Sequence, residues 1–155
     1  MLKNNMISLI IHIFVGFVTR FIYGSILTFV AITKNKNSGI IMSVMSIIIF
    51  VISLALYFIL GKRFLKENSD LKNAFSVAMV AVIGIISWIV SYNISPKISE
   101  GIMSWFFYFV YNMYLIPLRS HIGIFNPIIA MILVFIPSLL MWSGIQFKTN
   151  LLHNK

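Results

Sequence analysis

Apolar residues dominate this chain in five long stretches, which short polar segments separate. The stretches hold 17 to 27 residues each, near the length of about 20 that a helix needs to cross a bilayer. We therefore predict an all-α, polytopic membrane protein with about five transmembrane helices, as a single membrane domain over residues 1–155. The predicted spans are residues 6–32, 39–60, 74–92, 102–118 and 127–147.

Glycine, proline and asparagine mark the predicted helix ends. Gly61, followed by two cations, fits the C-terminus of the second helix. Asn126 and Pro127 form a cap and first-turn pair for the last helix, which Pro137 should kink. The fourth stretch is short and aromatic and ends at Pro117. The alternative is therefore four crossings with a re-entrant or interfacial fourth segment.

The first stretch carries a pattern of its own, because polar or small residues recur at every fourth position: Ser8, His12, Gly16, Arg20, Gly24 and Thr28. Residues four apart lie above one another on a helix, with a drift of about 40° per step. Gly16 and Gly24 on this polar ridge would let another helix approach closely. We expect His12 to be buried and hydrogen-bonded, in preference to a ligand or proton-relay role.

Arg20 needs compensation, because a guanidinium at the middle of a transmembrane helix costs roughly 2.5–3.5 kcal/mol on insertion scales. The three acidic residues, Glu67, Asp70 and Glu100, all fall in predicted loops. The sequence leaves as partners backbone carbonyls, the polar groups of Tyr108, Tyr111 or Asn112, a bound anion, or an acid on another protein. Helix tilt that brings Arg20 to a headgroup is the simpler interpretation.

Composition and charge support a lipid environment, since 60% of the residues are hydrophobic and only 10% are charged. The net charge of +9 is spread over loops and termini, which favours contact with anionic lipid and argues against nucleic acid. We expect Lys62, Arg63 and Arg119 to make such lipid contacts. With five spans, six cations fall on the N-terminal side and five on the other, which weakly favours an N-terminus inside the cell membrane.

The sequence carries no sign of catalytic chemistry. It has no cysteine, its three histidines are far apart, and no nucleophile motif is present, so we expect no enzyme activity, cofactor or metal. The interpretation that fits best is an accessory or immunity-type membrane subunit, which docks on a protein partner or a second copy through the polar ridge. A small oligomeric transporter or channel for an anionic or neutral solute is the alternative. The candidate contact residues are Arg20, His12, Gly16, Gly24, Tyr111 and Asn112.

Overall fold

The computed structural model describes residues 1–33, 37–98, 103–122 and 126–153, and in these ranges it contains helices and no strand. Three helical segments are long and apolar enough to cross a membrane: Leu2–Thr33, Ser38–Phe64 and Pro127–Asn150. They correspond to the first, second and last predicted spans. The helical class is thus confirmed, whereas a count of five spanning helices is not.

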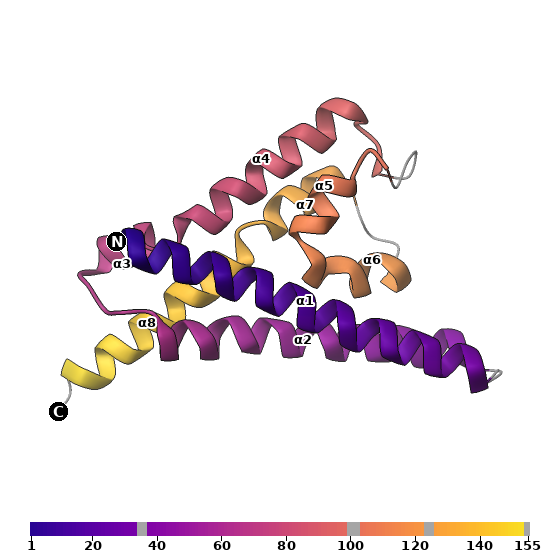
Figure 1. The fold of residues 1–155 in the computed structure, drawn as a ribbon, viewed down its shortest axis with the longest axis horizontal. Helices are drawn as coiled ribbons and strands as arrows, with labels where there is room; N and C mark the ends of the chain where they lie inside the picture. The colour runs from indigo at the N-terminus through magenta and orange to yellow at the C-terminus, as the bar shows by residue number, and fades with distance from the viewer. Residues whose placement is uncertain (34–36, 99–102, 123–125, 154–155) are drawn as a thin grey trace.

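Helices α1 (Leu2–Thr33) and α2 (Ser38–Phe64) run antiparallel, and α8 (Ile136–His153) crosses α2 near its C-terminal end (Figure 1). At this crossing Gly61 faces the backbone of Met141, and Gly144 faces the backbone at Phe58 and Lys62. The prediction that Gly61 ends its helix is wrong, because α2 continues to Phe64. Gly61 instead lacks a side chain so that α8 can approach the α2 backbone.

The third predicted span is divided in two. Helix α3 (Asp70–Phe75) ends before Ser76, and α4 (Ala78–Ile94) has 17 residues, too few to count among the spanning helices above. Asparagines at the start of α1 secure this junction. Asn5 donates to the carbonyl oxygen of Phe75 (3.0 Å) and accepts from the amide of Met79 (3.1 Å). These bonds satisfy backbone groups that the end of one helix and the start of the next leave without helical partners.

The fourth predicted span is not one helix, which corrects the expectation for residues 102–118. It consists of α5 (Phe106–Tyr111), a single 3₁₀ turn η2 (Met113–Leu115) and α6 (Ile116–Ile122). Pro117 explains the break, because its ring cannot donate to the carbonyl of Met113 and would collide with it in a continuous helix. Pro117 therefore belongs to the first turn of α6, where proline is tolerated. We call residues 106–122 the α5–α6 hairpin.

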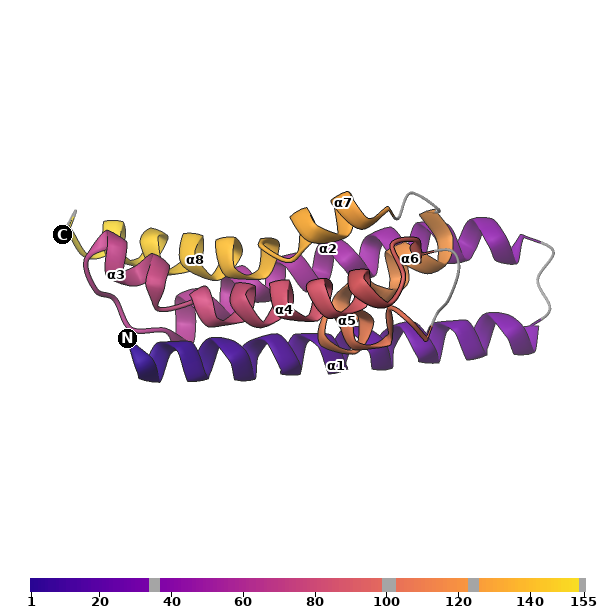
Figure 2. The same cartoon turned by 90° about the horizontal axis from the view of Figure 1, so that it is seen from above.

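Helix α7 (Pro127–Leu133) begins as the sequence predicts: the Asn126 side chain accepts from the amide of Ile129 (2.8 Å), and Pro127 occupies the first turn. The predicted interruption at Pro137 is also present, since the helix breaks at residues 134–135 before α8 starts. Figure 2 shows α1 and the α7–α8 pair on opposite sides of the molecule.

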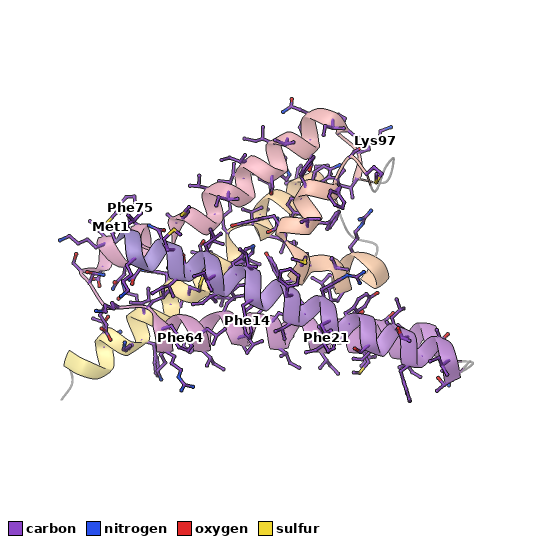
Figure 3. All side chains as sticks on the ribbon, in the orientation of Figure 1. Met1, Phe14, Phe21, Phe64, Phe75 and Lys97 are labelled. Atoms are coloured by element: carbon purple, nitrogen blue, oxygen red, sulfur yellow. The ribbon has the colours of Figure 1, made fainter. Side chains whose placement is uncertain are left out.

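Hydrogen bonds define two ends of the molecule. At one end Asn4 donates to the carbonyl of Lys66 (2.8 Å), and Lys148 forms an ion pair with Glu67 (2.5 Å), so the start of α1 and the ends of α2 and α8 lie together. At the opposite end Trp105 donates to the carbonyl of Ser95 (3.1 Å). Both chain termini lie at the first end (Figure 1), and Met1 and Lys97 mark the two ends in Figure 3.

The α5–α6 hairpin begins and finishes on the Lys97 side of the molecule. Helix α5 starts beside Ser95, and η2 lies in the interior. Ile116 of α6 then packs against a cluster of buried side chains from α1 and α2, toward the connection between these helices. The chain therefore turns back at residues 112–113 without reaching the end that holds the termini.

Candidate functional site: a groove with two arginines

The turn of the α5–α6 hairpin is attached to α1 and α2 through His12, which is 1% exposed. The carbonyl oxygen of Tyr111 can only accept, so His12 Nε2 carries the proton and donates to it (3.0 Å). The Tyr57 hydroxyl lies 2.9 Å from His12 Nδ1 and donates to this second nitrogen. A neutral histidine thereby satisfies the last carbonyl of α5, which has no helical partner.

Three tyrosine hydroxyls attach the hairpin to its other neighbours. Tyr108 donates to the carbonyl of Ala130 (2.7 Å), Tyr111 to that of Val80 (2.8 Å), and Tyr114 to that of Leu133 (2.6 Å). The Leu133 carbonyl is available because Pro137, four residues later, has no amide proton. Tyr108 and Tyr111 thus donate to backbone carbonyls of α7 and α4, and neither forms a hydrogen bond with Arg20 among the described residues.

Asn112 and Gly16 lie next to this turn. Asn112 is 1% exposed and donates from Nδ2 to the carbonyl of Tyr108 (3.1 Å), while its Oδ1 has no hydrogen-bond partner among the described residues. It makes no bond to Arg20 in this part of the chain. A Cβ on Gly16 would lie 3.3 Å from Met113 Cβ, so this glycine admits η2 against α1. Gly16 thus permits close packing of the α5–α6 hairpin of the same chain against α1.

The turn creates a groove of about 620 Å³ between α1 and the hairpin. Arg20 of α1 and Arg119 of α6 both line it. The remaining lining residues are apolar and come from the hairpin: Phe106, Phe109, Val110, Met113 and Ile116. Because the α5–α6 hairpin supplies all of the walls except Arg20, the groove exists only because the chain turns back at residues 112–113.

The two arginines lack an acidic partner in the part of the chain that is described. Arg20 is exposed, and the Arg119 guanidinium stacks 4.2 Å from the centre of the Phe109 ring. The acids Glu67 and Asp70 lie at the opposite end, and the hydrogen bond from Lys148 lowers the pKa of the Glu67 carboxyl. Glu100 falls outside the described residues. Stacking on an aromatic ring leaves the edge of a guanidinium free to bind an anion.

The other candidate residues lie apart from this groove. A Cβ on Gly24 would meet no atom of the described residues within 4 Å, so no close approach of this part of the chain requires a glycine here. Lys62 lies 4.4 Å from the centre of the Phe147 ring, and Arg63 stacks on Phe64, both near the end that holds the termini. The polar ridge is accordingly divided: Ser8, His12 and Gly16 are buried inside the molecule, and Arg20 and Thr28 are exposed.

Sequence reasoning assigned Arg20 and Arg119 to separate roles and missed that they share one groove. The only available signal was Pro117, which favours a turn over a continuous helix. No group of histidine, aspartate or glutamate side chains in the described ranges could hold a metal ion. No family model, curated protein or solved structure matches this chain.

Proposed function

We propose that the chain crosses the cell membrane four times, through α1, α2, α4 and the α7–α8 pair, and that the α5–α6 hairpin re-enters without crossing. Two observations support this topology. Both termini lie at one end, and the hairpin begins and finishes on the side of Lys97. With 17 residues, α4 extends about 25 Å, and a bilayer accommodates so short a span by becoming locally thinner.

This topology makes the charge distribution asymmetric. Seven cations belong to the side of the termini: Lys3, Lys62, Arg63, Lys66, Lys72, Lys148 and Lys155. Four belong to the other side: Lys34, Lys36, Lys97 and Arg119. By the positive-inside rule both termini face the cytoplasm. The bias is larger than the six to five of a five-span chain because Arg119, Lys148 and Lys155 change sides.

The function that the groove supports best is binding of an anionic amphiphile from within the bilayer. The observation that carries this proposal is the pair Arg20 and Arg119 on an otherwise apolar groove, with no carboxylate near them among the described residues. An exposed side chain at the depth of Arg20 faces lipid, where a bare guanidinium is unfavourable by about 2.5–3.5 kcal/mol. An anionic headgroup compensates this charge, while an alkyl chain covers the apolar walls.

The experiment is native mass spectrometry of the protein extracted in mild detergent. Arg20→Gln and Arg119→Gln are compared with wild type and with Lys72→Gln, which removes an exposed cation outside the groove. We expect wild type and the Lys72 variant to retain an anionic lipid, and either groove variant to bind it at least about tenfold more weakly. A hydrogen bond to a charged group contributes roughly 1.5–3 kcal/mol, and about 1.4 kcal/mol corresponds to a factor of ten.

Two results would contradict this function. If all four proteins carry the same lipids, the arginines do not bind an anionic amphiphile. If a protein partner is present and is lost from Arg20→Gln but not from Arg119→Gln, the chain is an accessory subunit. The exposed Arg20 and the open surface at Gly24 would then form the docking face, because Ser8, His12 and Gly16 are covered.

A further inference from the structure

We infer that the groove selects amphiphiles whose headgroup is a phosphate monoester over those with a single negative charge. This inference rests on the proposed function and specifies its ligand. It follows from the number of guanidiniums, the absence of a nearby acid in the described ranges, and the apolar character of the remaining walls.

The two positive charges that line the groove favour a ligand with two negative charges. Two guanidiniums line the same groove, and the described acids Glu67 and Asp70 are at the other end of the molecule. A carboxylate or a phosphodiester compensates one positive charge and leaves the second in an apolar setting, where an unpaired charge is unfavourable. A phosphate monoester carries nearly two negative charges above its second pKa of about 6, and its three oxygens can each accept from a guanidinium.

The apolar side chains that form the rest of the groove favour a ligand with a hydrocarbon chain. Phe106 and Val110 are 51% and 46% exposed on the outer face of α5, beside the more buried Phe109. Inorganic phosphate has no apolar part to lie along these side chains within the bilayer, whereas an alkyl chain packs against them. A volume of about 620 Å³ lies within the range of pockets that hold whole organic ligands, which is more than a headgroup alone requires.

The test uses ligands of one chain length, so that only the headgroup changes. Dodecyl phosphate, methyl dodecyl phosphate and dodecanoate are titrated into the purified full chain in a non-ionic detergent at pH 8, and inorganic phosphate is titrated separately. We expect dodecyl phosphate to bind at least about tenfold more tightly than each of the other three. Arg20→Gln or Arg119→Gln should remove this preference, and Lys72→Gln, which changes an exposed cation outside the groove, should keep it.

The outcomes separate the two proposals. If the three amphiphiles bind equally but still need both arginines, the selectivity is overturned and the proposed function stands. If inorganic phosphate binds as tightly as dodecyl phosphate, or if no ligand depends on the arginines, both proposals fail. Arg20→Lys and Arg119→Lys guard against a folding defect: they keep the charge but lose the planar fork, so binding should be intermediate at unchanged thermal stability.

Discussion

Replacing Gly144 with alanine should destabilise the protein by about 2–3 kcal/mol, the upper part of the range for overpacked cores. A Cβ at this position would overlap the backbone of α2, since it would lie 2.8 Å from the amide nitrogen of Lys62 and still closer to the Phe58 carbonyl. Helix backbone atoms cannot relieve such an overlap by a rotamer change, as a side chain could. Helices α2 and α8 must therefore separate along their whole crossing, with loss of contacts around Met141.

The matched control for this prediction is Gly24→Ala, because nothing lies within 4 Å of a Cβ at that position. In a helix interior alanine is favoured over glycine by about 0.8–1 kcal/mol, so this variant should keep or slightly raise the stability. Thermal unfolding of both variants in the same detergent makes the comparison. Equal melting temperatures for Gly144→Ala and wild type would show that α2 and α8 do not cross at these glycines.

Replacing His12 with leucine should cost about 3 kcal/mol and loosen the α5–α6 hairpin. The substitution leaves the Tyr111 carbonyl and the Tyr57 hydroxyl buried without their partner, and each such group costs roughly 1–3 kcal/mol. Hydrogen exchange followed by mass spectrometry should show faster exchange in residues 106–119 of this variant, while α8 stays protected.

The double variant with Tyr57→Phe tests whether these groups act together. Removing the hydroxyl alone should cost about 1 kcal/mol, since only His12 Nδ1 loses a partner. Leucine at position 12 strands this hydroxyl and also removes the nitrogen that the hydroxyl served, so neither cost applies in the double variant. It should therefore be less unstable than the sum of the singles, by about 2 kcal/mol. Strictly additive losses would contradict the bond between Tyr57 and His12.

Hydropathy and local motifs predicted the parts of the fold that local chemistry decides. The long apolar runs of α1 and α2 are helices, and the Asn126–Pro127 start and the break before Pro137 follow from one capping oxygen and one missing amide proton. The position of Arg20 in the middle of an apolar run likewise marks it as a residue that requires a partner. Nothing in the sequence marks Arg119 as a second groove residue, because 99 positions separate the two.

The remaining features depend on contacts between distant segments. Gly61 has the local signature of a helix end, yet its role is set by Met141, 80 positions later. The hairpin turns back because hydroxyls of Tyr108, Tyr111 and Tyr114 find carbonyls on α4 and α7, which no periodicity within residues 102–118 reveals. The polar ridge has a divided role for a related reason: His12 and Gly16 face this hairpin, whereas Arg20 and Thr28 are exposed.

The most direct test of this account is the side of the membrane on which Asn126 lies, because the groove exists only if the α5–α6 hairpin re-enters. The chain has no cysteine, so single variants Ser69→Cys, Lys97→Cys, Asn126→Cys and Asn150→Cys can be labelled in sealed vesicles with an impermeant maleimide. We predict that positions 97 and 126 label from one side and positions 69 and 150 from the other. Labelling of position 126 together with 69, and of 150 together with 97, would mean five crossings and would contradict the hairpin and its groove.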